Sequence, residues 1–287
     1  MGPVRKRRSL VLPGNVMRTD AETGRGTFAA LRCLPNNSSL PRGQVLLIPG
    51  FTGSKEDFAA LLPLLAEAGW IATTYDQRGQ YESPAAAGDD FSLGGLAADA
   101  RALSDAVFGT AERVHLVGHS FGGLVAASAA LRWPTCWASL TLLCSGPGGL
   151  GARLREDLTA VATALEREKL EFVYQAMVKR DRQRGSSPQS PEIEEFLHRR
   201  FLANSPDSLV AIARHLGHAP DLTDDLVALD LPAKVMRGEH DTWPHDVQDE
   251  LADALDTRVV VIADAAHSPA WEQPEQTRDA LVRVWMS

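Results

Sequence analysis

A serine between glycines, Ser120, is the residue of this chain whose surroundings first suggest chemistry. It lies in the segment VHLVGHSFGG, Val114 to Gly123, where an apolar run gives way to a helical pattern. A serine hydroxyl becomes a nucleophile only when a base removes its proton and a substrate can reach it. A sharp strand-to-helix turn exposes the hydroxyl, and Gly118 and Gly122 suit such a turn because they lack a Cβ atom. We therefore predict Ser120 as the nucleophile, with a glycine-rich helix entry as the alternative.

Two later segments supply an acid and a base, in the chain order that such a site requires. Asp241 follows the strand pattern Ala233 to Arg237, in GEHDTWPH, and His267 follows the strand pattern Arg258 to Ile262, in ADAAHSPAWEQP. An imidazole can accept the serine proton, and a carboxylate can orient that imidazole and stabilise its cation. We expect Ser120, His267 and Asp241 to form a catalytic triad.

The acid has competing interpretations. Glu239 is its neighbour in the same loop, and Asp241 could instead cap a helix that Pro244 opens. An acid could also follow the strand pattern that ends at Cys144. The loop Ser145 to Arg155 contains no carboxylate, however, so that position is excluded.

Acyl transfer also needs two backbone N–H donors for the developing oxyanion. The residue after the nucleophile, Phe121, supplies one at the start of a helix. The segment PGFTGSKEDF follows the strand pattern Val45 to Ile48, and Gly50 frees its backbone. Phe51 is therefore the second predicted donor, with an ordinary glycine turn as the alternative.

Several further side chains lie near these residues in the sequence. We expect His119, Trp243 and Trp271 to line or shape a substrate pocket, although aromatic residues near strand ends can also belong to the core. His215 and His218, followed by Asp221, could bind a metal, but histidines exposed at a helix end are the favoured interpretation. The proposed chemistry calls for no metal and no organic cofactor.

The order of apolar and helical patterns predicts an α/β fold. From Val45 onward the strand patterns are apolar without alternation, which is typical of a parallel sheet covered on both faces. The predicted strands are Thr27–Leu34, Val45–Ile48, Trp70–Tyr75, Arg113–Val117, Ser139–Cys144, Ala233–Arg237 and Arg258–Ile262. The predicted helices between them are Ser54–Ala68, Leu93–Val107, Phe121–Arg132, His245–Leu255 and Pro274–Trp285.

One long interval, residues 146–231, lacks a strand pattern and reads as a helical insertion on one edge of the sheet. Its helical stretches are Leu154–Arg182, Pro191–Leu202 and Ser208–His215, and the polar segment Arg180–Ser190 is expected to be a loop. We expect residues 1–145 and 232–287 to form the core domain, and residues 146–231 to form a lid.

Composition excludes several classes of protein. The 287 residues carry a formal net charge of −8, which argues against nucleic acid as a partner. The apolar run Leu10 to Leu12 is too short for a signal peptide, and no stretch approaches the ~20 apolar residues of a membrane span. Three cysteines, an odd number without metal-type spacing, favour free thiols and a cytoplasmic location. A small-molecule substrate is the expected partner, and the oligomeric state is left open.

Together these motifs resemble the serine α/β-hydrolase superfamily, over about Val45 to Cys144 and Ala233 to Trp285. The matching segments are PGFTGS, DQRGQYES, GHSFGG, GEHD and AAHSP. The resemblance implies an α/β-hydrolase fold with a helical lid, and esterase-like activity through an acyl-enzyme. Two positions depart from common patterns: Pro49 stands where many relatives have histidine, and Tyr81 replaces the second glycine of D-x-R-G-x-G-x-S.

The same triad serves several reactions. The favoured interpretation is hydrolysis of a carboxylic ester with an apolar acyl or alcohol part. Lactone, thioester, amide and carbon–carbon bond hydrolysis and cofactor-free haloperoxidase or perhydrolase activity are alternatives. Haloalkane dehalogenases and epoxide hydrolases use an aspartate as the nucleophile. Ser120 therefore argues against both of these activities. A ligand-sensing binding protein is a different functional class. Such proteins usually lack one triad residue, and this sequence has lost none.

Overall fold

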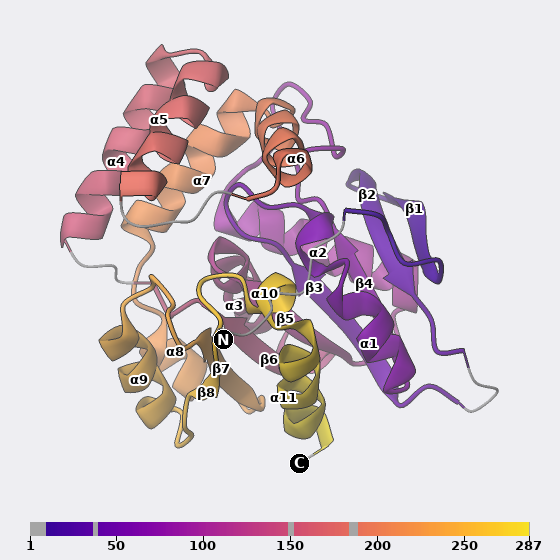
Figure 1. The fold of residues 1–287 in the computed structure, drawn as a ribbon. Coiled ribbons are helices and arrows are strands. Elements are labelled where there is room, and N and C mark those ends of the chain that lie inside the picture. Colours follow the sequence, from indigo (N-terminus) through magenta and orange to yellow (C-terminus); the bar gives the residue numbers. More distant parts are fainter. Residues whose placement is uncertain (1–9, 37–39, 149–151, 184–188, 287) are drawn as a thin grey trace, which may run out of the picture.

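The computed structural model describes residues 10–36, 40–148, 152–183 and 189–286. An eight-stranded sheet forms its centre, in the order β1-β2-β4-β3-β5-β6-β7-β8 (Figure 1). β1 and β2 pair antiparallel to each other, β2 pairs antiparallel to β4, and the remaining pairs are parallel. The strands are β1 (Val16–Thr23), β2 (Gly26–Cys33), β3 (Gly43–Ile48), β4 (Trp70–Tyr75), β5 (Val114–His119), β6 (Trp137–Leu143), β7 (Ala233–Gly238) and β8 (Val260–Ile262). The predicted α/β-hydrolase fold is confirmed.

Helices cover both faces of the sheet, as the non-alternating strands require. Leu46 and Ile48 of β3 face one apolar cluster, whereas Val45 and Leu47 face the other. The first cluster takes in residues of α2 (Leu93–Phe108), α3 (Phe121–Arg132) and α9 (His245–Ala254), and the second takes in residues of α1 (Leu61–Glu67) and α11 (Pro274–Met286). Parallel strands buried on both faces place their carboxyl ends, and the loops that follow them, at one edge of the sheet.

The predicted helix Ser54–Ala68 was wrong as a single element. The chain instead forms the short 3-10 helix η1 (Lys55–Phe58), a turn, and then α1. Pro63 explains the break, because it has no N–H to donate within a continuous helix. A helix that restarts at Leu61 places Pro63 in its first turn, where backbone N–H groups have no partner within the helix in any case.

The sequence patterns also missed the edge strand β1. Its apolar side chains are few, and Val16 and Ala21 are its two buried residues. An edge strand with one solvated face buries too little to show an apolar pattern. The turn at Gly24 and Arg25 joins β1 to β2 in a hairpin.

Helices alone fill the described part of the interval between β6 and β7. They are α4 (Ala152–Arg167), α5 (Leu170–Gln183), α6 (Pro191–Leu202), α7 (Pro206–His218) and the unpredicted α8 (Thr223–Val227). The predicted loop Arg180–Ser190 was wrong at its start, because α5 continues to Gln183, and residues 184–188 lie outside the described residues.

The interval lies over the carboxyl ends of β3 and β4 rather than along a lateral edge of the sheet (Figure 1). Ser205, which precedes α7, donates its N–H to Gly79 O at 2.8 Å, in the loop that follows β4. The Ser208 hydroxyl donates to Arg78 O at 3.1 Å in the same loop. A small apolar cluster of its own, with Leu165, Phe201 and Leu209 among its buried residues, holds the helices together.

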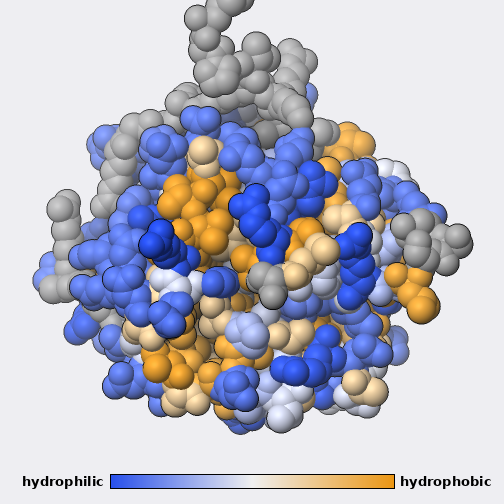
Figure 2. Space-filling model, turned by 90° about the horizontal axis from the view of Figure 1, so that it is seen from below, coloured by the Kyte–Doolittle hydropathy of each residue, from blue (hydrophilic) through white to orange (hydrophobic). Residues whose placement is uncertain are grey.

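The surface is mixed in character. Seen from below, on the side away from α4 and α5, apolar patches alternate with hydrophilic residues (Figure 2). Within the part of the chain that the structure describes, no helix combines the length and the apolar character needed to cross a bilayer.

Candidate active site

The turn between β5 and α3 holds Ser120 in a conformation that few non-glycine residues adopt. Its φ is +53° and its ψ is −122°. A Cβ atom on Gly118 would lie 2.2 Å from Gly122 O, and one on Gly122 would lie 2.4 Å from Ile48 O. Both positions therefore require glycine. The turn is further fixed by Ser145, whose hydroxyl donates to Ser120 O at 2.7 Å.

Three loops bring the predicted acid, base and nucleophile together. His267 Nε2 lies 3.1 Å from Ser120 Oγ, and His267 Nδ1 lies 2.6 Å from Asp241 Oδ1. The Asp241 side chain is fully buried, and that of His267 is about one third exposed. This continuous chain of hydrogen bonds can move a proton from the hydroxyl to the imidazole while the carboxylate holds the ring.

Both carboxylate oxygens of Asp241 accept hydrogen bonds. Besides His267, its Oδ1 accepts from Trp243 N at 3.1 Å, and its Oδ2 accepts from the Gln248 side-chain amide at 3.1 Å. Burial alone would raise the pKa of Asp241, but the hydrogen bonds and the nearby imidazole outweigh it and hold that pKa below its usual value. The group therefore stays negatively charged, as a partner for an imidazolium must.

Glu239, the competing acid, lies elsewhere in the loop. Its Oε2 accepts from Asp264 N at 3.1 Å, on the exposed surface. The structure thus joins Asp241 to His267 and uses Glu239 to connect two surface loops.

His119 lies behind the base and is itself buried. Its Nε2 is 2.6 Å from His267 O. Because a carbonyl oxygen can only accept, this nitrogen carries the proton. Burial, assisted by the nearby His267, lowers the pKa of His119 to about 4, so the ring is neutral near pH 7. His119 therefore holds the backbone of the histidine loop.

The loop that carries Phe51 lies directly against the nucleophile. A Cβ atom on Gly50 would be 3.1 Å from Ser120 Cβ, a tight contact that glycine avoids. Phe121 opens α3, where backbone N–H groups have no acceptor within the helix. The Phe51 side chain is partly buried and packs against both the sheet cluster and the cluster of the helical interval.

The predicted pocket residues differ in burial. The Trp243 indole is 5% exposed and belongs to the core cluster beside α3, and a Cβ atom on Gly146 would meet its Nε1 at 2.8 Å. Trp271 lies partly buried on the short helix α10 (Pro269–Glu272), directly after the histidine loop. Their assignment to the pocket stays a prediction.

Potential metal ligands gather at one place among the described residues, where ligand atoms of His119, Cys144 and His267 lie within 4.8 Å of one another. Both nitrogens of His267 already face Ser120 and Asp241, so this group belongs to the site just described. His218 and Asp221 instead face local partners: His218 Nδ1 lies 3.0 Å from Arg214 O, and Asp221 Oδ1 accepts from Thr223 N at 2.9 Å.

Tyr81, the departure from the glycine pattern, contacts the helical interval. Its φ is +36°, a value that favours glycine. The ring meets Phe196 of α6 edge-on, with 5.9 Å between ring centroids, and Lys55 Nζ lies 4.8 Å from its centroid. The side chain thus joins the loop after β4 to α6.

The chain belongs to the α/β hydrolase family, whose model matches residues 45–280. Over 247 residues it is 27% identical to a pimeloyl-[acyl-carrier protein] methyl ester esterase of Aeromonas hydrophila, covering 81% of this chain and 91% of that protein. It is 41% identical to a "Putative carbamate hydrolase RutD" of Variovorax paradoxus, but over 34% of this chain. That match spans 36% of the relative, so the chain aligns with about a third of that protein's length.

Solved structures share the fold over nearly the whole chain. A thermophilic esterase from Thermogutta terrifontis superposes with a TM-score of 0.74 and 27% identity, covering 94% of this chain and 98% of that one. An enol-lactonase from Burkholderia xenovorans superposes with a TM-score of 0.77 and 20% identity, covering 94% and 100%. At 20% identity, the superposition on the enol-lactonase shows a shared fold and nothing further.

Sequence reasoning missed three buried glutamines of this site. Gln248 contacts Asp241, and Gln77 and Gln80 donate to the loop that carries Phe51. A signal existed for Gln248, because it occupies the buried face of α9 together with Leu251 and Ala252. A polar residue on an apolar helix face needs a hydrogen-bond partner inside the protein.

Proposed function

We propose that this protein is a serine hydrolase that cleaves a carboxylic ester of a small, largely apolar substrate through an acyl-enzyme. The observation that carries the proposal is the hydrogen-bond chain from Ser120 Oγ through His267 to the buried carboxylate of Asp241. Membership of the α/β hydrolase family supports it, as does the likeness to an esterase at 27% identity.

In the first half-reaction, His267 Nε2 takes the proton of Ser120 as the oxygen attacks the substrate carbonyl carbon. The carbonyl π electrons move to its oxygen, and the N–H groups of Phe51 and Phe121 stabilise that oxyanion. Collapse of the tetrahedral intermediate breaks the bond to the alcohol, which leaves with the proton from His267. Asp241 keeps the imidazole oriented and stabilises its cation throughout.

In the second half-reaction, His267 takes a proton from water, which attacks the acyl-enzyme. The second tetrahedral intermediate releases the carboxylic acid, and the proton returns to Ser120. These steps need no metal and no organic cofactor.

The helical interval 146–231 would act as the lid of this site. Contacts of α6 and α7 with the loops after β3 and β4 support this proposal, as does the position of Phe51 between the two apolar clusters. Lids of this kind exclude water and shape the acyl pocket. The three cysteines are free, which favours a reducing compartment such as the cytoplasm.

The test uses p-nitrophenyl esters of graded acyl length together with a fluorophosphonate probe, which labels an activated serine. We expect wild type to turn over the esters and to be labelled at Ser120. Ser120→Ala should lose labelling and at least on the order of 10⁴-fold in turnover. Ser128→Ala, a serine removal on the same helix α3, is the matched control and should keep both. Full turnover by purified Ser120→Ala would overturn the proposal.

A further inference from the structure

Two buried glutamines hold three consecutive carbonyl groups of the loop that carries Phe51. Gln77 Nε2 donates to Pro49 O at 2.9 Å. Gln80 Nε2 donates to Gly50 O at 2.8 Å and to Phe51 O at 3.1 Å. These three oxygens thus all face the segment that follows β4.

The hydrogen bonds of Gln80 fix which way its amide faces. Its Oε1 accepts from Gln77 N at 3.2 Å, while its Nε2 meets two carbonyl oxygens. Rotating the amide by 180° would place Oε1 against both carbonyl oxygens, so this orientation is the one that satisfies the group. The side chain is fully buried, and water cannot replace it as a donor.

A bond to Gly50 O also determines the direction of the next N–H group. Gly50 C=O and Phe51 N–H belong to one peptide unit, which is planar and trans, so the two bonds point in opposite directions. The Cβ position of Gly50 lies 3.1 Å from Ser120 Cβ, while its carbonyl oxygen meets Gln80 Nε2. Holding Gly50 O toward Gln80 therefore turns the Phe51 N–H the opposite way.

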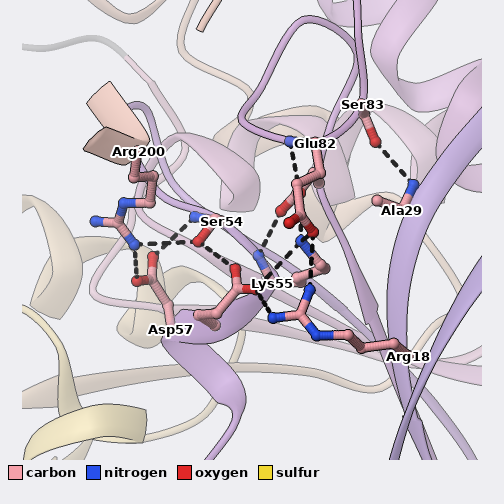
Figure 3. A network of polar contacts seen from close by, with 10 residues as sticks. Arg18, Ala29, Ser54, Lys55, Asp57, Glu82, Ser83 and Arg200 are labelled. Carbon is pink, nitrogen blue, oxygen red and sulfur yellow. Dashed lines mark hydrogen bonds and ion pairs between the residues drawn. The ribbon is translucent and has the colours of Figure 1, made fainter. Parts of the chain in front are cut away.

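The segment that carries Gln80 is itself firmly anchored. Lys55 Nζ, buried in η1, donates to Asp76 Oδ2 at 2.7 Å, and Asp76 Oδ1 accepts from Lys55 N at 2.7 Å. Glu82 and Arg18 extend this network (Figure 3). The backbone turns tightly, with Gln80 N donating to Gln77 O at 2.8 Å.

We propose that Gln80 is a positioning residue, which acts through Gly50 to aim the Phe51 N–H at the transition-state oxyanion. The proposal rests on the proposed function, because it needs Ser120 chemistry to generate that oxyanion. Without Gln80, Gly50 O keeps the longer hydrogen bond from Gly53 N at 3.2 Å. That weaker hold lets the Gly50–Phe51 peptide turn its carbonyl toward the site, which misdirects one donor and places an acceptor there.

The experiment compares Gln80→Met, which keeps the length of the side chain and loses both donors, with wild type. Losing an oxyanion donor costs ~10²- to 10³-fold in kcat, so misaiming one should cost roughly 10- to 100-fold. KM should change by less than about threefold, because the oxyanion forms only in the transition state. Affinity for a trifluoromethyl ketone, whose adduct with serine is an oxyanion, should fall in proportion to kcat/KM.

The matched control is Gln44→Met in β3, the same change at a partly buried glutamine distant from the site. It should keep kcat, KM and inhibitor affinity. If Gln80→Met does not fold, Gln80→Glu provides the test, because it keeps the shape and faces the two carbonyl oxygens with a carboxyl group.

Wild-type kcat in a folded Gln80 variant, or a loss confined to KM with unchanged inhibitor affinity, would overturn the proposal. An equal kcat loss in Gln44→Met would do the same. Failure of the proposed function looks different, because Ser120 would then stay unlabelled by the fluorophosphonate in the wild-type protein.

Discussion

Arg200 of α6 and Asp57 of η1 form an ion pair, 2.5 Å from Nη1 to Oδ1, that joins the helical interval to the segment just beyond Phe51 (Figure 3). The same Nη1 lies 3.2 Å from Ser54 Oγ, and the guanidinium carbon lies 5.4 Å from the centroid of the Phe196 ring. Asp57 Oδ2 in turn accepts from Ser54 N at 3.3 Å. We therefore expect a displacement of α6 to shift the loop beside Ser120.

Arg200→Leu should destabilise the fold by about 1–3 kcal/mol, because Asp57 loses a charge-assisted hydrogen bond. It should also raise KM for long acyl esters more than for acetyl esters, since α6 then lies less firmly over the site. Urea unfolding and an ester series measure the two effects. The control is Arg182→Leu, which breaks an exposed pair with Glu194 and should cost under about 1 kcal/mol. Equal destabilisation by the two variants would contradict the prediction.

Asp241→Asn should lower kcat/KM by on the order of 10³- to 10⁴-fold, because an amide neither stabilises the imidazolium nor selects the correct tautomer of His267. Glu239→Gln should stay within about threefold of wild type, since the Glu239 side chain accepts its hydrogen bond from Asp264 N in the neighbouring surface loop. Steady-state kinetics with one activated ester decides between them. A larger loss in Glu239→Gln would assign the acid to Glu239.

Gln248→Leu should reduce kcat roughly tenfold, because it removes a donor to the Asp241 carboxylate, a hydrogen bond to a charged group. The Gln248 amide also donates to Ser145 O at 3.2 Å, so the variant loosens both loops at once. Gln248→Glu is the informative companion, since a second carboxyl beside Asp241 opposes its charge. An unchanged kcat in Gln248→Leu would show that its remaining hydrogen bonds suffice to hold Asp241.

His115 should make the fold less stable in acid. Burial, assisted by Arg113, lowers the pKa of His115 to about 4, against 6.5 for an unperturbed histidine. As the pH falls, His115 takes up its proton first in the unfolded chain. Its contribution to the free energy of unfolding is therefore complete above pH 6.5 and declines from there to about pH 4. In His115→Phe this decline should be shallower, as measured by urea unfolding at a series of pH values.

Comparing variant with wild type cancels the other titrations in the same range, those of His119 and Asp76 among them. His119, whose pKa also lies near 4, destabilises the fold in acid with the same sign. Burial raises the pKa of Asp76 to about 6, although the nearby Lys55 opposes that shift. The effect of Asp76 on stability has the opposite sign to that of His115, because stability is lost as the pH rises through about 6. A slope in His115→Phe equal to that of wild type would show that His115 does not titrate as described.

The fold and the meeting of Ser120, Asp241 and His267 could be predicted because each depends on local patterns. Strand patterns that are apolar throughout indicate a parallel sheet. Residues that follow the carboxyl ends of such strands lie together at one edge of that sheet. The edge strand β1 could not be predicted, since burial of Val16 and Ala21 alone leaves no periodic signal.

The supporting residues depend on contacts between distant segments, which no local pattern encodes. Gln80 meets Gly50 thirty positions away, and Arg200 meets Asp57 across 143 positions. The sequence shows only that DQRGQYES contains two glutamines. Which carbonyl oxygens they reach is decided by how the loops after β3 and β4 pack together.

The backbone conformation of Ser120 has a consequence for the stability of the turn. A positive φ of 53° costs a residue with a Cβ atom on the order of 1 kcal/mol or more, whereas glycine adopts it without that penalty. The hydroxyl is thus kept at the expense of local backbone strain. Replacing Ser120 with glycine should therefore relieve this strain and stabilise the turn, while it removes the proposed nucleophile.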